Sequence, residues 1–403
     1  MVFWPYRATS ARRKETQASI KSQGWPYGKD MPVANIPSGS SLFARVDVDQ
    51  GMLPAPPLSS RLGGSDRRRD IMQPILLARA AYLILFIDVL RKLGAPVDRE
   101  LCRAGLPSGC EEQPDAYIPM LPALRFIGRM ERSEGIEDLG AEAAQRVSMA
   151  LLDGRTAVAI DRAPTLHAAL RLACRGSCRE SPQLRVWTAA HGHHLRLCSR
   201  FAGSWPSSGL RHAQWLQNAV LAMIVGRFAG AGWCPRAMAF EAGFTPGREV
   251  SRQFSRTRLL TGRPATWIEL SASLLGEPQQ RTGPRGQTRP RGAPAVAEPD
   301  FPVSLKLALQ AYLGEGGPTV DLAAELAGTS VRTLQRRLKH LGASYSGIVG
   351  QARFERAARL LEDPAIKVTE VAYAVGYDDA AHFCRAFRRM AGKSPREFRR
   401  DRA

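Results

Sequence analysis

Hydrophobic and polar positions follow different periods in different regions of the chain. Residues 1–70 show no sustained period and are rich in Pro, Gly, Ser and Arg, so we expect 1–73 to be a disordered extension. From residue 74 onward, apolar residues recur at the spacing of buried helix faces. These stretches predict helices over 75–93, 117–133, 137–149, 164–174 and 209–229.

Strand-like alternation occurs in two places between these helices. "RVWTAAHGHHLRLCSRF" predicts two strands within 184–201, joined by a His-Gly-His turn. The stretch 235–244 alternates in the same way. Helices interspersed with strands predict an α+β domain over 74–276.

A break in composition separates this region from the C-terminal part. "GEPQQRTGPRGQTRPRGAPAVAEPD" is rich in Pro, Gly, Arg and Gln and nearly lacks large apolar residues, which predicts a flexible linker over 277–301. Beyond it, the pattern over 302–403 predicts short helices separated by turns, and therefore an all-α domain.

The stretch 319–342 has the pattern of a helix-turn-helix unit. Gly328 suits the left-handed residue that ends a first helix, and Ser330 is a good N-cap for a second. In "VRTLQRRLKHLG" the leucines form a buried stripe, and the opposite face carries Arg332, Gln335, Arg336 and Lys339. Arg can bond guanine and Gln can bond adenine in the major groove, so this face has the chemistry of base readout. A solvated helix surface is the alternative for a single motif of this kind.

The same layout recurs over 368–392, and this favours a paired DNA reader. We expect Phe383, Phe387 and Met390 to face inward and Asp378 or Asp379 to cap the helix. The residues left facing outward are Ala380, Ala381, His382, Cys384, Arg385 and Arg388. Between the two units, 346–363 predicts a linker helix that Pro364 ends.

The overall charge agrees with a polyanionic partner. Against 37 Asp and Glu stand 57 Lys and Arg, a net charge of +20, which attracts nucleic acid or an anionic membrane. The most apolar stretch, 75–90, is shorter than a membrane span and carries Arg79 and Asp88, so a buried or dimer-forming helix is expected. With no secretory signal at the N-terminus, we expect a soluble cytoplasmic protein.

The remaining chemistry predicts neither an enzyme nor a metal site. The seven cysteines are irregularly placed, as reduced thiols are, and Cys174 and Cys178 form a lone C-x3-C. His191, His193 and His194 fit the hairpin turn better than a metal site, since no second pair has ligand spacing. Phosphate-binding loops, nucleophile elbows and metalloprotease motifs are absent from the sequence, so we expect no catalytic activity and no cofactor.

The C-terminal motifs resemble the DNA-binding domain of AraC/XylS-type transcriptional regulators. The likeness is carried, over about residues 305–400, by "TSVRTLQRRLKHLG", "RFERAARLLED", "VAYAVGYDDAAHFCRAFRRMAG" and "KSPREFRR". It implies seven helices with two helix-turn-helix units, binding to promoter DNA, and most often activation. By the same resemblance, the positions that match base-contacting sites are Arg332, Gln335, Arg336, Ala380, Ala381, His382, Cys384 and Arg385. Ala380 and Ala381 offer only apolar contacts, so the first unit is expected to supply most of the specificity.

The region 74–276 resembles the N-terminal domain of the arabinose-binding subgroup of these regulators, chiefly in "GWCPRAMAFEAGFTPGREV" and "ATWIELSASLLGEP". The resemblance implies a domain that senses a small-molecule effector and forms a homodimer; the subgroup's name does not establish arabinose as the ligand. We therefore expect a bacterial activator that works with RNA polymerase. One alternative is a ligand-independent factor whose first domain only dimerises or contacts RNA polymerase. Another, a fused DNA-repair alkyltransferase, needs a reactive Cys in a Pro-Cys-His-Arg context, which no cysteine here has.

Overall fold

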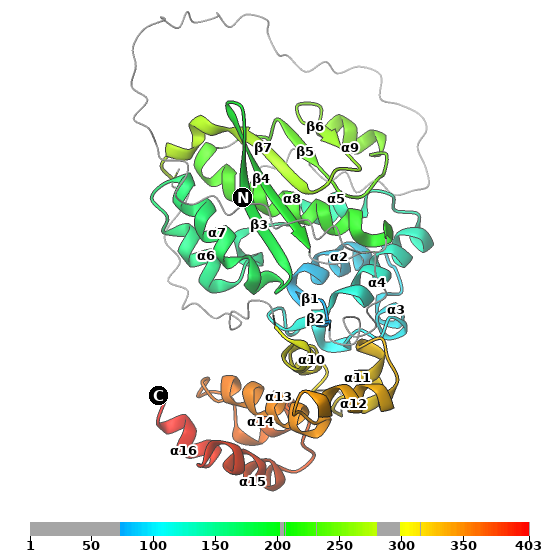
Figure 1. Cartoon of the computed structure of the whole chain (residues 1–403), viewed down its shortest axis with the longest axis vertical. Coiled ribbons are helices and arrows are strands. Elements are labelled where there is room, and N and C mark those ends of the chain that lie inside the picture. The colour runs from blue at the N-terminus through cyan, green and yellow to red at the C-terminus, as the bar shows by residue number, and fades with distance from the viewer. Residues whose placement is uncertain are drawn as a thin grey trace, which may run out of the picture.

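The computed structural model describes residues 73–402, except 202–204, 206, 231, 280–298 and 315. Figure 1 shows an α/β region above and a set of helices, from α10 to α16, below. The expected extension over 1–73 and most of the expected linker lie outside the described residues. The predicted fold class is confirmed: a mixed α/β region with a sheet precedes an all-helical region.

The α/β region contains the expected helices with different ends, and three further helices, over 97–103, 154–161 and 248–253, that the sequence pattern did not predict. Together they are α2 (Ala80–Lys92), α3 (Val97–Arg103), α4 (Met120–Glu134), α5 (Leu139–Ala144), α6 (Gly154–Asp161), α7 (Leu166–Glu180), α8 (Ser207–Ala229) and α9 (Arg248–Gln253). Two of the expected helices begin instead with short strands, β1 (Leu77–Arg79) and β2 (Tyr117–Pro119), which pair antiparallel. The apolar pattern could not reveal this pairing, because a three-residue strand at the start of a helix has no period of its own.

The main sheet has five strands, β3 (Leu184–His191), β4 (His194–Phe201), β5 (Ala237–Ala239), β6 (Arg258–Leu260) and β7 (Thr266–Ser271). Their order is β3-β4-β7-β5-β6, and all pairs are antiparallel except β5 with β6. The predicted hairpin within 184–201 is confirmed, with Gly192 at φ +59° in its turn. The sequence pattern did not predict β6 and β7.

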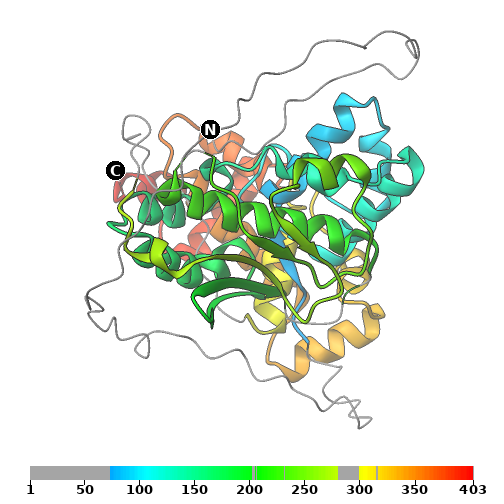
Figure 2. The same cartoon turned by 90° about the horizontal axis from the view of Figure 1, so that it is seen from above.

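Helix α8 is the centre of the α/β core. It packs against β7 on one side and against α4 and α5 elsewhere, and Figures 1 and 2 both show it alongside the sheet. Trp215 of α8 lies 4.7 Å from Phe240 and 5.2 Å from Phe254, measured between ring centroids. These rings and the surrounding aliphatic side chains form one continuous core.

Glu241, which follows β5, makes the stability of this region depend on pH. Its carboxylate lies 3.4 Å from Arg200 Nε, yet burial raises the pKa of Glu241 from 4.5 to about 7. The folded state therefore binds this proton more tightly than the unfolded chain, and stability falls as pH rises from 4.5 through 7. We expect Glu241→Gln to stabilise the protein by on the order of 2 kcal/mol at pH 8.5 and by much less at pH 5.5, as measured by thermal unfolding at both pH values. Equal effects at the two pH values would contradict this assignment.

The C-terminal region, from residue 299 on, contains seven helices among its described residues. They are α10 (Phe301–Gln310), α11 (Val320–Leu326), α12 (Val331–His340), α13 (Tyr345–Leu360), α14 (Val368–Ala374), α15 (Ala380–Ala391) and α16 (Pro395–Arg400). Helices α11 and α12 form the first helix-turn-helix, and α14 and α15 form the second. The helix α13 begins and ends close to the expected linker helix.

Each helix-turn-helix unit has its own hydrophobic core, and α13 contributes to both. Ile348, near the start of α13, packs in the first core with Leu334 and Leu338 of α12. Near the end of α13, Ala357 packs in the second core, which also contains Phe383 and Phe387 of α15. One continuous helix thus fixes the two units relative to each other.

The first of these cores extends into the α/β region. Leu77 of β1 and Tyr117 of β2 are buried in it together with Leu305 and Ala308 of α10. The backbone N–H of Ile75 donates to Ser304 Oγ over 2.9 Å, which adds a polar contact between the two regions. The α/β region and the helical region therefore pack directly against each other.

Candidate nucleic-acid interface and ligand pocket

Helix α12 presents the predicted polar face to solvent. Ser330 Oγ accepts a hydrogen bond from the Thr333 N–H and caps the helix, as expected. Leu334 and Leu338 are fully buried, and their burial fixes the rotation of the helix. The polar residues singled out from the sequence are all exposed on the other side: Arg332, Gln335, Arg336 and Lys339.

Helix α15 is held in the same way and has a similar exposed face. The Asp379 carboxylate accepts hydrogen bonds from the N–H groups of Ala381 and His382, each over 2.9 Å. These two bonds hold the pKa of Asp379 below its ordinary value, so the cap is charged at neutral pH. Phe383 and Phe387 are buried, and of the residues expected to face outward Ala381, His382, Arg385 and Arg388 are exposed.

Three residues of α15 lie differently from the sequence expectation. Ala380 and Cys384 are half-buried and pack against the second core instead of standing free on the outer face. Met390, expected to face inward, is 44% exposed. Phe354 and Phe398, from other helices, contact Phe387 in the second core, with ring centroids 5.0 and 5.3 Å away.

The two exposed faces are carried by helices that α13 holds apart. Figure 1 shows α12 and α15 at different ends of the helical region, with α13 between them. The 16 residues of α13 span about 24 Å at the rise of an α-helix. Two helices that read one side of a duplex must lie about 34 Å apart. The length of α13 together with the widths of the two units is compatible with this separation.

A cavity of about 100 Å³ lies inside the α/β region, between α2, α4, α6, α7, α8 and the first two strands of the main sheet. Its wall is mostly aliphatic and aromatic, with side chains such as Phe86, Ile118, Ile127, Leu216 and Ile224. A mostly apolar cavity bounded by several elements is the usual form of a small-molecule site. Sequence patterns did not predict this cavity, because its wall is assembled from segments distant in the chain.

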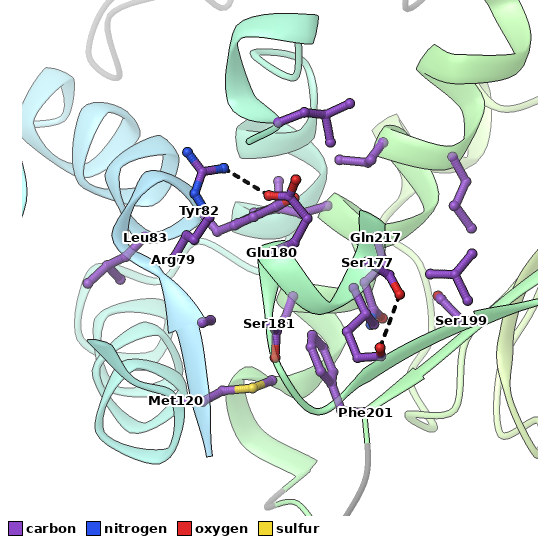
Figure 3. A pocket seen from close by; sticks show the side chains of 18 of the residues that line it. Arg79, Tyr82, Leu83, Met120, Ser177, Glu180, Ser181, Ser199, Phe201 and Gln217 are labelled. Atoms are coloured by element: carbon purple, nitrogen blue, oxygen red, sulfur yellow. Dashed lines mark hydrogen bonds and ion pairs between the residues drawn. The ribbon is translucent and has the colours of Figure 1, made fainter. Parts of the chain in front are cut away.

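One end of the cavity carries a buried ion pair (Figure 3). Arg79 Nη1 donates to Glu180 Oε2 over 2.8 Å and to the Leu151 carbonyl over 2.7 Å, and Arg79 Nη2 pairs with Asp115. Burial alone would lower the pKa of Arg79, but the adjacent Glu180 carboxylate holds it above the ordinary value. The charge of Arg79 is therefore already paired with two carboxylates within the protein, while its Nε–H has no hydrogen-bond partner.

Two other polar residues on the wall have no partner. The side-chain amide of Gln217, on α8, and the hydroxyl of Ser199, on β4, are buried and make no hydrogen bond. Figure 3 shows them to one side, away from Arg79. In the sequence, Gln217 is marked only as a polar residue that interrupts the apolar stretch "WLQNAVLAMIV".

The histidines of the hairpin contact side chains of the sheet. His191 Nδ1 lies 3.0 Å from Glu269 Oε2, and His194 Nε2 lies 2.9 Å from Arg236 Nη1. Within the described residues, no group of three or more His, Cys, Asp or Glu side chains is arranged to hold a metal ion. The helices of the described part include none that is long and apolar enough to cross a membrane.

Family models match both regions of the chain. A helix-turn-helix domain model matches residues 323–401 and includes most of both units. A model described as the arabinose-binding domain of AraC transcription regulators, N-terminal part, matches residues 94–279. Together the two models match most of the α/β region that holds the cavity, from residue 94 on, and the helices that carry the exposed polar faces.

Similar proteins are transcriptional regulators. The HTH-type transcriptional regulator VirS of Mycobacterium tuberculosis is 24% identical over 332 residues, which are 80% of this chain and 96% of VirS. The HTH-type transcriptional regulator VqsM of Pseudomonas aeruginosa is 40% identical over 82 residues, 20% of this chain and 25% of VqsM.

Among solved structures, the chain is similar to the transcriptional regulator CdpR of Pseudomonas aeruginosa, with 17% identity and a TM-score of 0.33 over 76% of this chain and 96% of CdpR. It is also similar to the DNA-binding domain of AdpA in complex with a target DNA, with 30% identity and a TM-score of 0.23 over 25% of this chain and 90% of that domain. From the two family models, which match residues 94–279 and 323–401, the chain belongs to the AraC-type DNA-binding transcriptional regulators.

Proposed function

We propose that this regulator responds to a small-molecule effector, which binds in the cavity of the α/β region and changes how α12 and α15 engage promoter DNA. In this proposal Arg332, Gln335, Arg336 and Lys339 of α12 contact the first part of the operator. The second part is contacted by α15, through Ala380, Ala381, His382, Cys384, Arg385 and Arg388. The half-buried Ala380 and Cys384 contribute least, which leaves most of the sequence discrimination to α12.

The strand β1 supports effector control, because its residues belong both to the cavity wall and to the core of the first DNA-binding unit. Ala78 and Arg79 line the cavity. The preceding residue, Leu77, is buried in the core that contains Leu334 and Leu338 of α12. A shift of β1 on ligand binding therefore acts on the packing beneath the recognition helix.

Hydrogen bonds tie β1 to the cavity wall and to α10. Ser181 Oγ, from a residue that lines the cavity, donates to the Leu77 carbonyl over 2.6 Å. The Leu77 N–H donates to Gln183 Oε1 over 3.0 Å, and Ser304 Oγ accepts from Ile75. Hydrogen bonds thus connect β1 and the residue segment before it to the cavity wall on one side and to α10 of the DNA-binding region on the other.

Filling the cavity by mutation tests the proposal without knowledge of the effector. Ala213 lines the cavity from α8, and we expect Ala213→Leu to change the dissociation constant for operator DNA by about 5-fold or more. The operator fragment comes from genome-wide mapping of binding sites, and the affinity of the full-length protein is measured by fluorescence anisotropy. The control is Ala190→Leu, the same change at an exposed position of β3 outside the cavity.

An unchanged affinity in a folded Ala213→Leu protein would favour the alternative, a ligand-independent factor whose α/β region only dimerises or contacts RNA polymerase. We also propose that the protein activates transcription as a homodimer in the bacterial cytoplasm, in association with the nucleoid. Transcription in vitro from the mapped promoter, with purified RNA polymerase, tests activation against repression. Sedimentation of the full-length protein tests the dimer.

A further inference from the structure

We propose that the cavity binds a small, neutral, mostly apolar molecule that carries one hydrogen-bonding head group, and that Gln217 and Ser199 hold this group. The inference rests on the proposed function and specifies its ligand. Gln217 is 9% exposed and its amide nitrogen and oxygen both lack a partner, while Ser199 is 1% exposed and its hydroxyl lacks one. Buried polar groups are nearly always paired in folded proteins, so unpaired groups on a cavity wall indicate a missing partner.

The paired charges on the wall exclude an anionic ligand. The charged residues that line the cavity are Arg79 and Glu180, and they bond to each other. Asp115 pairs with the same guanidinium group, which leaves it no excess positive charge. A carboxylate or phosphate in the cavity would be buried without a counter-charge, which is strongly unfavourable.

The other hydroxyl groups on the wall already donate within the protein, and this disfavours a sugar. Ser177 Oγ donates to the Leu184 carbonyl, Ser181 Oγ donates to the Leu77 carbonyl, and Tyr82 OH donates to Glu180. A pentose would bring several hydroxyl groups into a mostly apolar space whose unpaired polar groups are those of Gln217, Ser199 and Arg79 Nε, too few to pair all of them. The cost of its unpaired hydroxyl groups disfavours arabinose as the ligand, despite the name of the domain.

The polar groups and the volume together define the head group and the size of the ligand. A primary amide can donate to the Gln217 oxygen and accept from its nitrogen, and an alcohol can pair with Gln217 and Ser199 in a similar way. A cavity of about 150 Å³ lined by Leu, Ile and Phe is known to hold benzene, so about 100 Å³ holds a short alkyl chain or most of one small ring. Because the cavity is partly open, the rest of a substituted ring can extend toward its mouth.

Binding of four model compounds to the full-length protein tests the inference. Benzamide and benzyl alcohol have the proposed chemistry, benzoate has nearly the shape of benzamide but carries a charge, and arabinose is polar throughout. At millimolar concentration, we expect benzamide and benzyl alcohol to raise the melting temperature, and benzoate and arabinose to leave it unchanged. A shift with benzoate or arabinose as large as that with benzamide, or no shift with either neutral compound, would overturn the proposal.

The variant Gln217→Leu separates a ligand-binding role from a structural one. Because the amide has no partner in the protein, its removal should leave the melting temperature of the ligand-free protein unchanged or higher, and should weaken benzamide binding at least tenfold. The matched control is Gln351→Leu, at an exposed position of α13, which should bind benzamide as the wild type does. A lower melting temperature for Gln217→Leu, or undiminished benzamide binding, would contradict the assignment.

These results are independent of the DNA-binding test. If benzamide binds through Gln217 while Ala213→Leu leaves DNA affinity unchanged, the ligand class stands and effector control is wrong. If Ala213→Leu alters DNA affinity while none of the neutral compounds binds, effector control stands and the ligand class is wrong.

Discussion

Replacement of Arg336 by Ala should lower the affinity for operator DNA by about 5- to 150-fold, the range of one lost bidentate contact to a base. Arg336 is exposed on α12, on the face opposite the buried Leu334 and Leu338. A guanidinium group at this position can bond guanine in the major groove, and Ala cannot replace either bond. Affinity for a random duplex should change much less, because that binding depends on phosphate contacts. Fluorescence anisotropy with both duplexes, at several salt concentrations, measures the two effects.

Two further variants separate base recognition from charge. Arg389→Ala removes an exposed cation from α15 that is not among the predicted base-contacting residues. It should weaken binding to both duplexes equally and reduce the slope of log affinity against log salt concentration by about one. Arg132→Ala removes the same charge from an exposed position of α4 and should change neither affinity appreciably. If Arg336→Ala weakened the operator and the random duplex equally, Arg336 would be a phosphate contact and not a reader of sequence.

The C-terminal region was predictable because its signals are local and repeated. The positions of Leu334 and Leu338 alone decide which side of α12 is buried, and a recurrence of the same layout around Phe383 and Phe387 confirms the unit. The caps at Ser330 and Asp379 are likewise set by neighbouring residues. At Met390 the prediction was wrong, since helical spacing alone cannot show which residues near the end of a helix the neighbouring helices cover.

The cavity and its connection to α12 were not predictable, because both depend on contacts between distant segments. Arg79 falls inside a stretch whose apolar pattern predicted only a helix, yet it ends a short strand and pairs with Glu180, about a hundred residues later. The antiparallel pairing of β1 with β2 and the burial of Leu77 against α10 likewise have no local signal. Polar residues within an apolar period, such as Gln217 and Ser199, are the only trace of the site in the sequence.

Gly328 and Gly376, in the turns of the two helix-turn-helix units, have the same left-handed backbone conformation but different surroundings. Gly328, between α11 and α12, has φ +59°, and a Cβ there would meet nothing within 4 Å. Gly376, between α14 and α15, has φ +78°, and a Cβ there would lie 2.5 Å from the Leu313 carbonyl oxygen. Leu313 is fully buried, so its backbone cannot move aside without disturbing the packing after α10.

We therefore expect Gly376→Ala to destabilise its unit by about 2–4 kcal/mol, the sum of an unfavourable left-handed alanine and an overpacked contact. Gly328→Ala should destabilise its unit by only about 1 kcal/mol, the cost of an alanine in the left-handed conformation. Amide hydrogen exchange of the full-length protein resolves the two units: protection of α15 should fall about 30-fold or more in Gly376→Ala, and protection of α12 only about 5-fold in Gly328→Ala. Equal losses in the two variants would show that the turn conformation alone sets the cost. A larger loss at Gly376 would mean that Leu313 closely fixes the turn before α15, and through it the position of the second DNA-binding helix.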